Sequence, residues 1–126
     1  MEKWKRILIW TGQILFGFLF ILIGLTKVQA STSVIAQFEG WGIPMADKAI
    51  YIVGAIEICG GIGLLIPRTA RLAATGLVVV MAGAFVTHLV NAEWARLIVP
   101  LLFGTLLILI RHVRAQGPGP LDTIPA

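Results

Sequence analysis

Long apolar runs alternate with short polar stretches along this chain. Four runs carry few charged residues: Ile7 to Val28, Ala49 to Ile66, Leu72 to Val90 and Leu97 to Ile110. A helix that spans a membrane needs about 20 mainly apolar residues. The last run is shorter than this, so we expect its helix to begin earlier, near Trp94. The pattern therefore predicts an all-α protein, a bundle of four transmembrane helices.

Composition agrees with a membrane protein. Of 126 residues, 58% are hydrophobic and only 13% are charged, and the mean hydropathy is +0.94. Four spans and their loops leave no room for a separate soluble domain. We expect one transmembrane domain over residues 1–114 and a disordered tail over residues 115–126, which are rich in Pro and Gly.

The basic residues predict the orientation. The net charge of +4 does not indicate a nucleic-acid partner, because membrane proteins gather Lys and Arg on their cytoplasmic side. With the N-terminus inside, seven of the ten basic residues are cytoplasmic: Lys3, Lys5, Arg6, Arg68, Arg71, Arg111 and Arg114. The other three, Lys27, Lys48 and Arg96, are outside. We expect a multi-pass protein of the cell inner (plasma) membrane with both termini cytoplasmic.

Polar and small residues recur on one face of three of the predicted helices. The faces are Gln13, Gly17, Phe20, Gly24 and Lys27 on the first; Gly54, Glu57 and Gly61 on the second; Met81, Ala84 and His88 on the third. Small residues on a shared face allow helices to approach closely in lipid. We therefore expect these faces to turn into the bundle.

Three ionisable residues of these faces converge on the outer half of the membrane. A charged side chain at the centre of a spanning helix costs about 2.5 to 3.5 kcal/mol on insertion scales, so Glu57 should face the interior. We predict a polar ligand pocket there, with Lys27, Glu57, His88, Asn91 and Gln13 as its candidate residues.

The simpler alternatives stay open. Lys27 and Glu57 could form a structural pair that sets the helix register. His88 could be interfacial, and Gln13 could be a polar packing residue. We expect the single cysteine, Cys59, to be a small buried packing residue.

No catalytic or metal-binding motif is found in the sequence. The two histidines, His88 and His112, fall on opposite sides of the membrane and could not ligate one haem in a monomer. Glu57 and His88 alone are too few ligands for a metal. We therefore expect no intrinsic cofactor, no metal site, and no enzyme activity of the chain on its own.

Four stretches in order resemble the DoxX-like family of small four-helix membrane proteins: "GFLFILIGLTKV", "AQFEGWGIP", "GAIEICGGIGLLIPRTARLAA" and "MAGAFVTHL". The resemblance covers roughly Ile7 to Ile110. The positions that match the family's recurring features are Lys27, Pro44, Glu57, Gly60, Gly61, Pro67, Arg71, Met81, Ala84 and His88.

The resemblance implies a role beside redox enzymes. Namesakes of the family are linked to membrane redox complexes, including thiosulfate:quinone oxidoreductases, and related members to oxidative-stress assemblies. It favours a non-catalytic subunit or partner of a membrane oxidoreductase whose outer-leaflet pocket takes a quinone or lipid-like ligand. Two alternatives are a small proton-coupled transporter and a scaffold or chaperone for another membrane protein. The glycine faces are also compatible with a homo-oligomer.

Overall fold

Four long helices, one short helix and one 3-10 turn make up the part of the chain that the structure describes. The computed structural model describes residues 2–115. Its elements are α1 (Lys3–Val28), α2 (Thr32–Gly40), α3 (Ala46–Leu65), α4 (Pro67–Val90), the 3-10 turn η1 (Trp94–Leu97) and α5 (Ile98–Ala115). The predicted tail lies outside the described residues, apart from Ala115, which ends α5.

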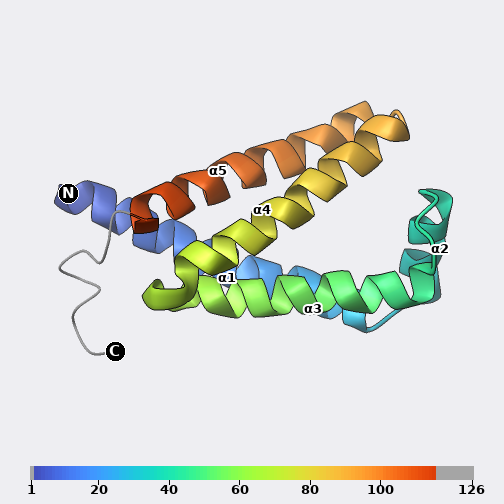
Figure 1. Cartoon of the computed structure of the whole chain (residues 1–126), viewed down its shortest axis with the longest axis horizontal. Coiled ribbons are helices and arrows are strands. Elements are labelled where there is room, and N and C mark those ends of the chain that lie inside the picture. The colour runs from blue at the N-terminus through green and yellow to red at the C-terminus, as the bar shows by residue number, and fades with distance from the viewer. Residues whose placement is uncertain (1, 116–126) are drawn as a thin grey trace.

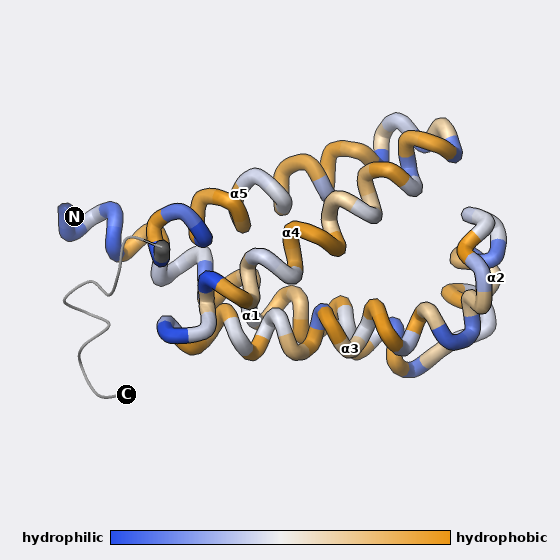
Figure 2. The backbone as a smooth tube through the Cα atoms, in the orientation of Figure 1, coloured by the Kyte–Doolittle hydropathy of each residue, from blue (hydrophilic) through white to orange (hydrophobic). Residues whose placement is uncertain are grey.

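The predicted transmembrane bundle is confirmed. Four helices are long and apolar enough to cross a membrane: α1, α3, α4, and the last, over Trp94–Arg114. The last span does begin at Trp94, because η1 leads directly into α5. Figure 2 shows hydrophobic colour along these helices, whereas hydrophilic colour gathers at their ends and around α2.

The bundle has two distinct ends. The start of α1, the turn between α3 and α4 and the end of α5 lie together at one end, here called the termini end, and α2 lies at the other, the α2 end (Figure 1). Pro67 occupies the first turn of α4, where its missing N–H costs nothing. The α2 end corresponds to the outer side that the charge distribution predicts.

The helices pack as two pairs, α1 with α3 and α4 with α5, and α3 contacts α4 to join the pairs. Between the termini end and the candidate site, the pairs share a core of buried residues that includes Phe20, Leu64, Leu77 and Leu107. Toward the α2 end the pairs diverge (Figure 1). The divergence leaves the space in which the candidate site lies.

Glycines set the distance between α1 and α3. A Cβ built on Gly61 would lie 2.5 Å from the carbonyl oxygen of Gly17, and one on Gly24 would lie 2.6 Å from the carbonyl oxygen of Gly54. Real Cβ atoms do not approach backbone oxygens this closely, so the helices touch only because these side chains are absent. The predicted small-residue faces of α1 and α3 are therefore confirmed as a helix interface.

Candidate functional site

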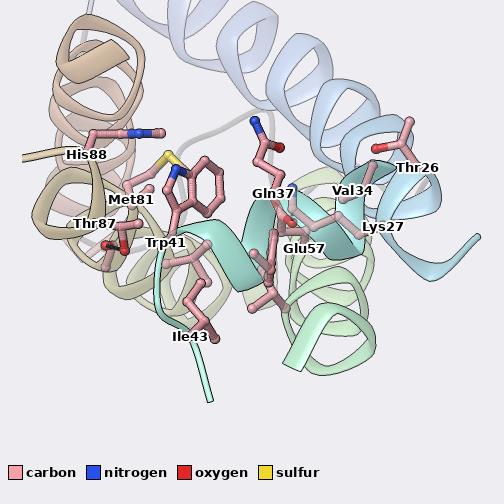
Figure 3. Close-up of a pocket in the computed structure, with 15 residues that line it drawn as sticks. Thr26, Lys27, Val34, Gln37, Trp41, Ile43, Glu57, Met81, Thr87 and His88 are labelled. Carbon is pink, nitrogen blue, oxygen red and sulfur yellow. Dashed lines mark hydrogen bonds and ion pairs between the residues drawn. The ribbon is translucent and has the colours of Figure 1, made fainter. Parts of the chain in front are cut away.

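A cavity of about 450 Å³ lies at the α2 end. Its walls come from the end of α1, from α2 and the loop after it, from α3 and from α4 (Figure 3). Most of its lining is apolar, and the polar side chains include those of Lys27, Glu57 and His88. A largely apolar cavity of this size with a few convergent polar groups has the character of a small-molecule site.

Glu57 is the most buried charged residue of the cavity wall. Only 1% of its surface is exposed, and its Oε1 lies 2.8 Å from Nζ of Lys27. The glycine contacts between α1 and α3 create this pair, since they bring the backbone of the two helices together within one turn of both residues. Charge compensation in a low-dielectric setting explains how the carboxylate can be retained inside a spanning helix.

This ion pair does not use all the hydrogen-bonding capacity of Glu57. The contact has the distance of a salt bridge, but Oε1 makes no hydrogen bond of acceptable geometry within the described residues. An ionised carboxylate offers about four lone-pair positions, and an ammonium group offers three protons. Both partners therefore keep hydrogen-bonding capacity beyond the ion pair.

Helix α2 closes the end of the cavity, and it was not predicted from the sequence. The hydroxyl of Ser31 caps the helix by accepting a hydrogen bond from the Val34 amide, at 3.4 Å. Phe38 is buried against Ala46 and Ile50 of α3, which fixes α2 across the end of that helix. A serine ahead of an apolar pattern was the available signal for this helix.

Trp41, directly after α2, joins the two helix pairs. Its indole Nε1 donates a hydrogen bond of 2.7 Å to Oε1 of Glu93, in the loop between α4 and η1. Its ring meets the His88 ring edge-on, with centroids 5.2 Å apart. Figure 3 shows the Trp41 ring between α4 and the Glu57 side of the cavity. Trp41 thus spans the space between the diverging pairs.

Glu93 contacts three side chains at this point, and it was not predicted from the sequence. The same Oε1 lies 3.1 Å from Nδ1 of His88, and Oε2 accepts a hydrogen bond of 2.9 Å from Arg96. Hydrogen bonding to His88, with further help from Trp41 and Arg96, lowers the pKa of Glu93 below its usual value. An acidic residue five positions after a histidine, in a short loop between spans, was the only sequence signal.

The structure brings together three of the five predicted pocket residues. Lys27, Glu57 and His88 all line the cavity. The imidazole of His88 pairs with Glu93 rather than with Glu57. Asn91 is exposed and does not line the cavity, and its side-chain amide donates to the carbonyl of Thr87.

Gln13 lies at the termini end, far along α1 from the cavity. It is fully buried; its Nε2 donates to the carbonyl of Leu64 at 2.8 Å, and its Oε1 accepts from Nε of Arg114 at 2.6 Å. The guanidinium of Arg114 also lies over the Trp10 ring, 5.0 Å from its centroid. Gln13 therefore joins α1, α3 and α5. This is the polar packing role that was the alternative to a place in the pocket.

The expectation for Cys59 is wrong. The side chain is exposed, on a side of α3 that neither α1 nor α4 covers. Its neighbours Gly60 and Gly61 contact Leu77 of α4 and Gly17 of α1, so the helix directs Cys59 away from both partners. Within residues 2–115, no group of three His, Cys, Asp or Glu side chains is placed to hold a metal ion.

Comparison with known protein families agrees with this architecture. The family model described as the DoxX-like family matches residues 11–110, which include all of the cavity-lining residues. Neither the curated proteins nor the solved structures provide a match to the chain. The matched region runs from the first turns of α1 to near the end of α5. The chain belongs to the DoxX-like family of membrane proteins.

Proposed function

We propose that this protein binds the head group of a quinone or lipid-like molecule in the α2-end cavity, as a non-catalytic partner of a membrane redox complex. The observation that carries the proposal is Glu57, a carboxylate 1% exposed that lines a cavity and has Lys27 as its ion-pair partner. A buried charge in a spanning helix is costly and is therefore a candidate for function.

The chemistry of the cavity suits such a head group. Protons of the Lys27 ammonium can donate to a quinone or ester carbonyl, and the Glu57 carboxylate can accept from a quinol or headgroup hydroxyl. Phe38 and Trp41 add aromatic surface to the wall, against which a planar ring can stack. Membership of the DoxX-like family supports the redox partner, and the cavity supports the ligand.

Ligand binding can be tested with a quinone titration in lipid nanodiscs. Trp41 lines the cavity, whereas the other three tryptophans do not, so a background with Trp4, Trp10 and Trp94 replaced by Phe makes Trp41 the reporter. Quenching of its fluorescence should follow quinone binding. Glu57→Gln keeps the shape but removes the charge, and we expect it to weaken binding at least tenfold.

A matched control is Glu39→Gln, because Glu39 is an exposed glutamate of α2 that does not line the cavity. This variant should bind as the wild type does. Equal binding by wild type and Glu57→Gln would contradict the proposed site. If no quinone or lipid-like probe binds and Glu57→Gln changes stability alone, the Lys27–Glu57 pair is structural.

The redox partner needs a separate test. The protein is purified from its native membranes under mild conditions, and the sample is assayed for quinone reductase activity against a sample from cells lacking the chain. We expect activity that depends on the chain. Equal activity in the two samples would contradict the partnership and leave ligand binding to its own test.

A further inference from the structure

The wall of the cavity contains one position that is also exposed deep along a spanning helix. Gly83 lines the cavity and is exposed. It lies seven residues before the end of α4 at Val90, which is about 10 Å along the helix axis. Because α4 is about 36 Å long and a bilayer core is about 30 Å thick, Gly83 lies inside the hydrocarbon region.

The other exposed lining residues lie elsewhere. They are Thr26, two residues before the end of α1, and Gln37 of α2. Both face the interface at the α2 end. Gly83 therefore differs from these two exposed residues in depth, since it lies farther from the end of its helix.

The depth of Gly83 matches that of the ion pair. Built Cβ atoms on Gly63 and Gly60 of α3 would meet Ala73 and Leu77 of α4. Continuing this antiparallel register along both helices places Glu57 opposite Val80, which also lines the cavity. Gly83 is three residues farther along α4, about 4.5 Å. An exposed part of the cavity wall thus lies at nearly the level of Glu57.

We infer that the cavity opens into the bilayer at Gly83 and that its ligand carries an apolar isoprenoid or acyl chain that leaves the cavity through this opening. The inference rests on the proposed ligand binding and adds the chain and its route. The wall beside the opening is formed by Val80, Met81 and Ala84, which are apolar and suit such a chain. The space beside Gly83 is open, since a Cβ built there would have no heavy atom within 4 Å, so a large side chain at this position would occupy it.

The test compares two quinones that share a head group and differ in chain length, one with ten isoprene units and one with a single unit. Both are titrated in nanodiscs against the background in which Trp41 is the reporter. Gly83→Phe should weaken binding of the long-chain quinone at least tenfold more than binding of the short-chain quinone. Gly83→Leu is a smaller second variant, with the same expected direction, should the Phe variant not fold.

Gly76→Phe is the matched control. Gly76 lies two turns earlier in α4, does not line the cavity, and has no heavy atom within 4 Å of a built Cβ. It should leave binding of both quinones within twofold. If wild type binds both quinones and Gly83→Phe affects both equally or neither, the lateral opening is refuted while the proposed site stands. If wild type binds neither, the proposed function fails and the inference fails with it.

Discussion

Nζ of Lys27 lies 2.8 Å from Oε1 of Glu57, and this contact joins α1 to α3 at the cavity wall. Lys27 retains one fifth of its side-chain exposure, whereas Glu57 retains almost none. The carboxylate therefore depends on its partner far more than the ammonium does. Removal of either residue should have unequal consequences.

Lys27→Met should be the more damaging single change, because it leaves Glu57 buried and uncompensated. We expect it to lower the free energy of unfolding by about 3 kcal/mol, the lower end for breaking a buried pair. Lys27→Met combined with Glu57→Leu should recover most of this loss. Unfolding in mixed micelles with increasing SDS is measured for the wild type, the two single variants and the double variant. Additive single effects would mean that the two side chains are not coupled.

The glycine interface predicts a contrast between two alanine substitutions. Gly61→Ala should destabilise by about 1 to 3 kcal/mol, because its Cβ would meet the backbone of Gly17, which cannot move aside cheaply. Gly76→Ala meets nothing and should be neutral or stabilising by up to about 1 kcal/mol, since Ala favours a helix more than Gly does. The same micelle unfolding assay compares them. Similar effects of both changes would argue against close packing of α1 on α3.

The contacts of Glu93 predict a pH dependence. Since the pKa of Glu93 is lowered in the folded protein, its stabilising effect is complete above the ordinary carboxyl value of 4.5 and is lost as the pH falls through the lower folded value. Protonation should weaken its bonds to His88 and Trp41 and loosen the loop after α2. Hydrogen exchange of residues 41–45 should therefore rise in acid, after correction for the intrinsic exchange rate.

Glu93→Gln should remove the part of this acid response that comes from the loop. Asp47→Asn is its control, because Asp47 is an exposed acidic residue in the first turn of α3 at the same end. The control should keep the acid response of the wild type. An unchanged response in Glu93→Gln would assign the pH dependence to another group.

Gln13 separates packing from ligand binding. Gln13→Leu removes the hydrogen bonds to the Leu64 carbonyl and to Arg114, and we expect it to destabilise by about 1 to 3 kcal/mol. It should not change quinone binding, because Gln13 does not line the cavity. Thermal unfolding and the Trp41 titration measure the two effects. Weakened binding at unchanged stability would contradict a packing role.

Much of this fold could be predicted from residue spacing. The recurrence of Gln13, Gly17, Phe20 and Gly24 identified the buried face of α1, and all four are buried. The buried face of α3 was identified in the same way, from the spacing of Gly54, Glu57 and Gly61, and all three are buried. Helical periodicity carries this information because each residue's position around the axis follows from its number.

Spacing could not predict the contacts made after the chain turns back. Trp41 and Glu93 are 52 residues apart and meet only because α2 lies across the diverging pairs. For a related reason, the structure places Gln13 away from the cavity and exposes Cys59. A helical face shows which residues share a side, but the partner on that side depends on where the neighbouring helices lie.

The sequence by itself determined that this is a four-span membrane protein, and which faces of α1 and α3 are buried, because length, hydropathy and periodicity are local properties. Only the tertiary structure decided that the two helix pairs diverge, that a cavity opens between them, and that Trp41 and Glu93 bridge it. Those features depend on the angles at which helices cross. The crossing angles follow from the contacts of many side chains together, and no single stretch of sequence contains them.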